Sequence, residues 1–164
     1  MRAFAKIVAV GVFIVGISAL SQTASATTCT FGSVIFDGVS GADLTSSTAC
    51  ADAAGGGPLG NDTQANIDAL DPFGIFDWVL ADKSDGGGDN AIVLLDVVNG
   101  ITSGAWRVDS LNGYTDVFLT LKSTNGYAAY LLDTAFLSGD WTTANIFTNK
   151  QGKAQAISHI SLYY

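Results

Sequence analysis

The sequence contains no glutamate, one histidine, two cysteines and two prolines, and each shortage narrows the range of functions. With so few His and Cys residues and no Glu, most metal sites and most nucleophile–base pairs of enzymes cannot be assembled. Basic residues are also scarce, because only five Lys and Arg follow residue 26, against fifteen Asp, which gives residues 27–164 a net charge of −10. This acidity argues against a nucleic-acid partner, since binding a phosphate backbone needs Lys and Arg on one face.

The longest apolar run lies at the N-terminus. Arg2 and Lys6 flank its start, residues 7–20 are uncharged and apolar, and a small-residue stretch ends in Ala-x-Ala at Ala26. This layout predicts a secretory signal peptide over residues 1–26. The run is shorter than the about 20 apolar residues of a spanning helix, so we expect no membrane span in the mature chain. The location expected is secreted, extracellular or at the cell surface.

Export changes the interpretation of the two cysteines, Cys29 and Cys50. In an oxidising compartment they are expected to form a structural disulfide bond. A reactive thiol or a metal pair is the alternative, but neither has a His or a third Cys nearby. Residues 27–60 are rich in Gly, Ala, Ser and Thr and offer one short strand, residues 33–37. We interpret them as a loop-rich, disulfide-pinned start of the domain.

From residue 74 onward the pattern predicts β-strands. Residues 74–82 alternate between apolar and polar side chains, and residues 91–98 are a nearly continuous apolar run, as in a strand covered on both faces. Residues 115–122 have a period of two. One face of that segment carries Val117, Leu119 and Leu121, and the other carries Asp116, Thr120 and Lys122.

Three Asn-Gly dipeptides, each 13 residues after the last, punctuate this region: Asn99-Gly100, Asn112-Gly113 and Asn125-Gly126. Asn-Gly favours the type I′ turn of a β-hairpin, so residues 101–108, 114–122 and 127–133 are predicted to form an antiparallel meander. Further strands are expected around residues 141–147 and 157–163, and no helix of ten residues or more after the signal peptide. The predicted fold is all-β, a single antiparallel, jelly-roll-like β-sandwich of about eight strands over residues 27–164.

Two tetrapeptides share the form Ser-Gly-x-Trp and end at Trp106 and Trp141. Their order relative to the Asn-Gly-Tyr tripeptides is mirrored, so they do not indicate a tandem repeat. The two indoles are candidates for exposed, sugar-stacking side chains, whereas Trp78, between Phe76 and Leu80 on an alternating segment, is predicted to lie in the core.

Several short stretches follow one another in an order that resembles a family of bacterial exported proteins. They are residues 60–62, 78–83, 103–109, 119–122, 126–133, 138–141 and, above all, 157–163 (Ile-Ser-His-Ile-Ser-Leu-Tyr). The ordered set resembles the ectodomain of the PEP-CTERM family, which an exosortase sorts. The resemblance implies a β-rich secreted domain of a Gram-negative bacterium, associated with the cell surface, biofilm or exopolysaccharide matrix. It implies no established catalytic activity or cofactor.

One feature of that family does not follow in this sequence. Its members continue into a Pro-Glu-Pro motif, an apolar helix and a basic tail, whereas the sequence stops at Tyr164. The chain is therefore expected to be either a freely secreted relative or a truncated sequence.

His159 is the one side chain whose ordinary pKa lies near neutral pH. On a strand over residues 157–164 it shares a face with Ile157, Ser161 and Tyr163. A general base needs a nucleophile and an orienting group, and the mature chain has no Gly-x-Ser-x-Gly motif. We therefore predict a structural, hydrogen-bonded histidine.

The loop over residues 82–90 is the best ligand candidate, because Asp82, Asp85 and Asp89 surround a run of three glycines. Carboxylate and carbonyl oxygens of such a loop can coordinate Ca²⁺. The spacing matches neither an EF-hand nor a calcium-binding repeat, so a solvated hairpin loop is the alternative. No other cofactor is expected.

These features favour a non-catalytic secreted structural or matrix-interaction protein with exopolysaccharide or the cell-surface matrix as its partner. The alternative is a carbohydrate-binding module that uses exposed aromatic side chains. An enzyme acting on glycans through Asp is the third hypothesis, and it requires two facing carboxylates.

Overall fold

A computed structural model describes seven parts of the chain: residues 34–35, 44–52, 61–70, 72–75, 77–124, 126–144 and 146–164. The described residues form two antiparallel sheets and very little helix, which confirms the predicted all-β class. Residues 1–26, the expected signal peptide, lie outside the described part, and so does Cys29. Cys50 is fully buried in β2, and its bridge to Cys29 stays a prediction.

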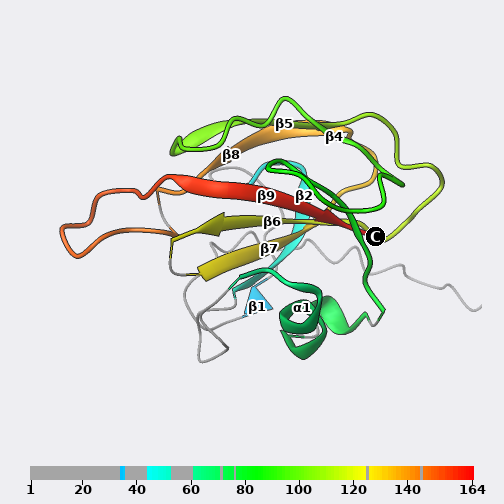
Figure 1. Cartoon of the computed structure of the whole chain (residues 1–164), viewed down its shortest axis with the longest axis horizontal. Coiled ribbons are helices and arrows are strands. Elements are labelled where there is room, and N and C mark those ends of the chain that lie inside the picture. Colours follow the sequence, from blue (N-terminus) through cyan, green and yellow to red (C-terminus); the bar gives the residue numbers. More distant parts are fainter. Residues whose placement is uncertain are drawn as a thin grey trace, which may run out of the picture.

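The two sheets differ in size. The larger one has six strands in the order β1 (Val34–Ile35), β2 (Ser47–Asp52), β7 (Gly126–Leu132), β6 (Phe118–Ser123), β9 (Ile157–Tyr163) and β3 (Leu80–Lys83). The smaller one has three, in the order β4 (Leu94–Leu95), β5 (Ser103–Val108) and β8 (Ser138–Thr142). Figure 1 shows the smaller sheet over one face of the larger sheet and the short helix α1 (Gln64–Leu70) beyond the other face. Neither helix in the described part is long and apolar enough to cross a membrane.

The larger sheet is buried on both faces. Towards the smaller sheet, Val117, Leu119 and Leu121 join one apolar cluster with side chains of β5 and β8, as the period of two predicts. The opposite face of β6 carries Thr120 and Lys122, which are buried too, because α1 and the 3₁₀ turn Pro72–Gly74 lie near that face. A second cluster, in which Ile67 meets Trp78 and aromatic side chains of the sheet, fills that side.

Two of the three predicted Asn-Gly hairpins connect paired strands. β4 and β5 pair antiparallel on either side of Asn99-Gly100, with Leu95 opposite Arg107. β6 and β7 pair from Ser123 opposite Gly126, so just two residues separate the strands. Asn112 and Gly113 have positive φ angles of 50° and 89°, as the turn requires, yet the chain there crosses from the smaller sheet to the larger one. The predicted meander is therefore wrong between β5 and β6, because a local turn preference does not decide which sheet receives the next strand.

Three segments predicted as strands are mostly irregular. Of the strand predicted around residues 141–147, only Trp141 and Thr142 are described as strand, at the end of β8. In residues 74–82 the strand begins only at Leu80, because Phe73, Gly74 and Asp77 have φ angles of 67–69°, which an extended strand does not allow. Trp78 is nevertheless 3% exposed, so the prediction that it lies in a core is confirmed. The apolar run over residues 91–98 contributes only β4, at the edge of the smaller sheet, and Val98 is 57% exposed, so this run is not covered on both faces.

The two Ser-Gly-x-Trp tetrapeptides are antiparallel partners in the smaller sheet. Trp106 of β5 lies opposite Gly139 of β8, and Trp141 of β8 lies opposite Gly104 of β5. Both indoles are buried in the cluster between the sheets, with exposures of 0% and 2%. Each glycine leaves the space beside the partner strand's indole free, since a Cβ on Gly104 would stand 3.2 Å from Trp141 and one on Gly139 would stand 2.8 Å from Trp106.

This arrangement predicts an unequal response to a single added methyl group. A Cβ on Gly139 would meet Oγ1 and the backbone O of Thr45 at 2.7 and 2.8 Å, whereas the contacts on Gly104 are all with side chains at 3.2 Å or more. We expect Gly139→Ala to lower the free energy of unfolding by about 3 kcal/mol and Gly104→Ala by about 1 kcal/mol. Urea unfolding of the two variants measures the difference, and equal losses would contradict the described register.

Candidate functional site

Asp62, just before α1, is the centre of a buried polar cluster on the outer face of the larger sheet. Its carboxylate is 2% exposed. Oδ1 accepts a hydrogen bond from Nε2 of His159 at 2.7 Å, and Oδ2 accepts bonds from the hydroxyls of Thr120 and Ser161, each at 2.5 Å. The backbone carbonyl of Asp62 accepts a further bond from the Tyr163 hydroxyl. Four side chains on two strands thus hold one residue of the segment that precedes the helix.

The register of β6 and β9 places these donors together. Thr120 lies opposite Ser161, and Lys122 opposite His159. The next pair joins Ser123 to Ile157, so Ser158 is an extra residue in β9. Because of this extra residue, Ile157 points to the other face of the sheet and joins the cluster between the sheets. The expectation that Ile157 shares the face of His159 is therefore wrong. The same expectation is confirmed for Ser161 and Tyr163, which bond to Asp62 as His159 does.

His159 joins this cluster to the surface. Its Nδ1 lies 3.3 Å from Oδ2 of Asp85, and Oδ1 of the same carboxylate lies 3.1 Å from Nζ of Lys83. Asp62, Lys83, Asp85 and His159 line a pocket of about 510 Å³, together with Gln64 of α1 and Leu80 of β3. The titratable side chains of the cluster therefore form part of the wall of a cavity.

The cluster alters the pKa values of its members. Burial alone raises the pKa of Asp62, but hydrogen bonds from His159, Ser161 and Thr120, and the charge of His159, outweigh burial and lower the pKa to about 2. Burial lowers the pKa of the Lys122 ammonium, while the negative charge of Asp62 opposes that effect. Burial also raises the pKa of Tyr127 to about 12. Asp62 is thus an ionised, acceptor-only carboxylate at neutral pH.

The geometry is suited to holding structure together. Both ring nitrogens of His159 face carboxylates, and the hydroxyls of Thr120 and Ser161 donate to Asp62, so the cluster does not pair a hydroxyl nucleophile with the imidazole. A glycosidase acid needs a raised pKa, and that of Asp62 is lowered. The prediction that His159 is hydrogen-bonded is confirmed. Sequence reasoning missed Asp62 as its partner, although residues 60–62 were already part of the family resemblance.

The lowered pKa of Asp62 predicts an acid-sensitive part of the stability. Since the folded pKa of about 2 lies below the ordinary value of 3.8, this contribution is fully present above pH 3.8 and is lost as the pH falls towards 2. Its size is about 2 kcal/mol. We expect urea unfolding between about pH 2 and pH 5 to show this loss of unfolding free energy in the wild type and not in Asp62→Asn. If the unfolding free energies of the two proteins fall in parallel with pH, the assignment of the loss to Asp62 is contradicted.

The three carboxylates of the candidate calcium loop have separate partners. Asp82 accepts bonds from the backbone N–H groups of Lys83 and Leu94, and Asp89 from the N–H of Ala91 and the hydroxyl of Tyr164. Asp85 faces Lys83 and His159. Within the part of the chain that the structure describes, no group of three His, Cys, Asp or Glu residues is placed to hold a metal ion. The loop does not bring Asp82, Asp85 and Asp89 to one common point.

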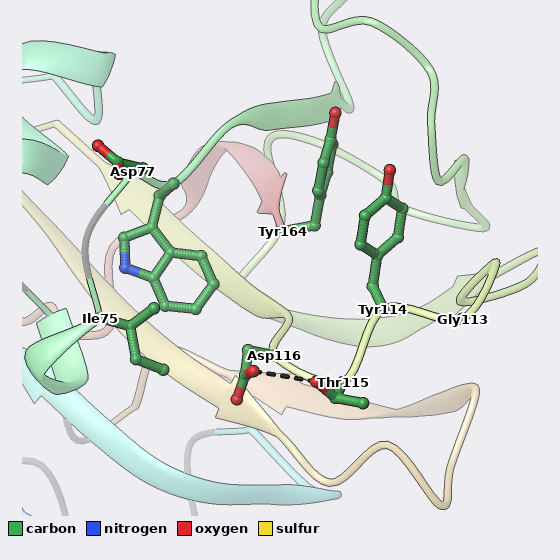
Figure 2. Close-up of a pocket in the computed structure, with 8 residues that line it drawn as sticks. Ile75, Asp77, Gly113, Tyr114, Thr115, Asp116 and Tyr164 are labelled. Carbon is green, nitrogen blue, oxygen red and sulfur yellow. Dashed lines mark hydrogen bonds between the residues drawn. The ribbon is translucent and has the colours of Figure 1, made fainter.

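The predicted sugar-stacking tryptophans are not available at the surface. Trp106 and Trp141 are buried between the sheets, so the expectation that their indoles are exposed is wrong. Instead, the exposed aromatic side chains include Tyr114, whose ring centroid lies 4.1 Å from that of Tyr164 with the two planes tilted by 36°. Figure 2 shows this tyrosine pair at one side of a pocket of about 290 Å³, which Asp77 and Asp116 also line.

Comparisons of this chain with protein-family models, with curated proteins and with solved structures found no match. The resemblance to the PEP-CTERM family therefore rests on the sequence stretches alone.

Proposed function

We propose that this chain is an exported, non-catalytic protein, similar to the ectodomains of the PEP-CTERM family, that interacts with the exopolysaccharide matrix at the surface of a Gram-negative bacterium. In this proposal residues 1–26 are the signal peptide and residues 27–164 form one jelly-roll-like β-sandwich. Two antiparallel sheets with a common apolar cluster support the sandwich. The basic, apolar and small-residue succession at the N-terminus supports export.

The observation that carries the proposal is the meeting of two family-like stretches at Asp62. Residues 60–62 and residues 157–163 are far apart in sequence, yet Asp62 accepts bonds from His159, Ser161 and Tyr163. The histidine, serine and tyrosine side chains, which are residue types that enzymes use, therefore bind the segment before α1 to the sheet. A shared motif that builds a scaffold favours a structural or binding role over catalysis.

The charge of the protein indicates which kind of polysaccharide in the matrix it can bind. Residues 27–164 carry a net charge of −10, and like charges repel. A matrix of neutral or amino sugars therefore suits this surface better than a polymer of acidic sugars.

A binding experiment tests the proposal. Mature protein is mixed with insoluble extracellular matrix purified from the source bacterium, and the fraction that sediments is measured against protein concentration. We expect saturable sedimentation, and an equally acidic globular protein of unrelated fold serves as the control for non-specific trapping. Sedimentation no greater than that of the control would reject a role in the matrix.

The alternative, a carbohydrate-binding module, is favoured by a specific observation. Tyr114 and Tyr164 form an aromatic wall beside two exposed carboxylates. Aromatic rings next to hydrogen-bonding groups are suited to ligands with both apolar and polar faces. The two hypotheses are compatible, because a module of this kind would provide the contact with the matrix.

A further inference from the structure

The pocket beside Tyr114 is built by three segments that are distant in sequence. Ile75, Asp77 and Trp78 precede β3, residues 113–116 precede β6, and Tyr164 follows β9 (Figure 2). β3 pairs with β9, and β9 pairs with β6, so the start of β3, the start of β6 and the end of β9 lie side by side at one end of these strands. The pocket is therefore a product of the sheet topology and not of one flexible loop.

Hydrogen bonds hold the tyrosine pair in place. The backbone N–H and C=O of Tyr164 both bond to Val79, and its hydroxyl donates to Asp89 at 2.7 Å. The backbone N–H of Tyr114 donates to the carbonyl of Leu111 at 2.9 Å. These bonds hold the Tyr164 ring and the backbone of Tyr114, and the Tyr114 ring rests against the Tyr164 ring. A ligand that stacks here therefore loses less affinity to the ordering of side chains.

The aromatic surface remains partly free. Each ring uses one face for the contact between them, in which the ring centroids lie 4.1 Å apart. Tyr114 remains 37% exposed in this pair. A pyranose ring presents C–H groups on its faces, and such groups pack against the negative face of an aromatic ring.

The polar groups of the pocket define the charge of the ligand. Asp77 and Asp116 are exposed and line the cavity, and Asp116 accepts a bond from the Thr115 hydroxyl at 3.0 Å. Carboxylates accept hydrogen bonds from hydroxyl and ammonium groups and repel acids. The volume of about 290 Å³ lies at the lower end of ligand pockets, which suits one sugar ring better than a long segment of chain.

We infer that this pocket binds one pyranose ring of a glycan, a ring that carries hydroxyl or amino groups and no acid group. Tyr114 provides the stacking face, and Asp77 and Asp116 accept hydrogen bonds from the ring substituents. The inference rests on the proposed matrix interaction and gives that interaction a site and a class of sugar.

Isothermal titration calorimetry of the mature protein tests the inference with three oligosaccharides of matched length. They are a neutral glucan, a glucosamine oligomer and a galacturonic acid oligomer. We expect the neutral or the amino oligomer to bind and the acidic oligomer to bind at least about tenfold more weakly. Tyr114→Ala should lower about tenfold the affinity for the oligomer that binds. Tyr114→Phe keeps the ring and should change this affinity less than about twofold.

The outcomes separate the pocket from the wider function. If the protein sediments with matrix but none of the oligomers binds, or if Tyr114→Ala binds as the wild type does, the pocket is wrong and the matrix interaction stands. Tighter binding of the acidic oligomer also overturns the inference. Failure of both sedimentation and calorimetry overturns the pocket and the proposed function together. A thermal unfolding curve for each variant verifies that a loss of binding is not a loss of folding.

Discussion

Replacing Asp62 by alanine is expected to lower the free energy of unfolding by about 4 kcal/mol. The change leaves the hydroxyls of Thr120 and Ser161 and Nε2 of His159 buried without their acceptor. Each buried donor that loses its partner costs about 1–3 kcal/mol, and three donors lose theirs here. Thermal and urea unfolding measure this loss, which should lower the melting temperature by about 10 °C.

Two other variants control for this result. Asp68 lies on α1, is exposed and accepts one bond from Gln64, so Asp68→Ala removes a carboxylate of the same segment at an expected cost below about 0.5 kcal/mol. Asp62→Asn keeps the shape and one carbonyl acceptor, so its cost should lie between the other two. Equal stabilities of Asp62→Ala and Asp68→Ala would show that the buried cluster does not fasten the helical segment.

Gly88→Ala is expected to cost about 3 kcal/mol of folding stability, the second large effect. Gly88 has a φ of +93°, and a Cβ at this position would stand 2.3 Å from the carbonyl oxygen of Ala81 in β3. The same oxygen accepts the N–H of Asn90 at 2.7 Å, so the loop returns tightly against the strand. An alanine must push the loop away and weaken that hydrogen bond.

The neighbouring glycine supplies a matched control for Gly88→Ala. Gly87 also has a positive φ, +124°, but a Cβ there meets nothing within 4 Å. Gly87→Ala therefore carries the backbone strain without the clash, at an expected cost of about 1 kcal/mol. Urea unfolding of both variants distinguishes the two effects, and a similar loss in both would mean that close approach to Ala81 is unimportant.

The sequence predicted the central strands well because their side chains alternate. β9 spans Ile157–Tyr163, as expected from residues 157–163, and the apolar side of β6 faces the smaller sheet as its period of two indicates. Alternation is a local property that the strand itself enforces. It also allowed the opposite face of β6 to be assigned to Thr120 and Lys122, although not their burial.

Other features depended on contacts between distant residues. Trp106 and Trp141 were expected at the surface, yet each is covered because the other's strand presents a glycine beside it. The Gly-x-Trp spacing in both tetrapeptides is the signal in the sequence, because residues two apart share a strand face and an antiparallel register places each indole opposite a glycine. The role of Asp62 is harder to predict, since its partner His159 lies 97 residues away and the sequence contains fifteen Asp with similar turn-like surroundings.

The same buried contacts connect the fold to the proposed function. The cluster at Asp62 and the paired tryptophans stabilise the two faces of the larger sheet. The tyrosine pocket at the sheet edge then occupies a fixed position, since Tyr164 continues directly from β9. In the proposed function, these contacts make the protein an acidic scaffold that holds the tyrosine pocket ready for the matrix.

A chain-length assay on the purified matrix polysaccharide tests most directly whether this protein binds without catalysis. Soluble polysaccharide is incubated with wild-type protein and with His159→Gln, and new reducing ends and bound protein are measured in the same samples. We predict saturable binding by both proteins and no new reducing ends in either. Reducing ends that accumulate with the wild type and vanish with His159→Gln would contradict a structural histidine and identify an enzyme.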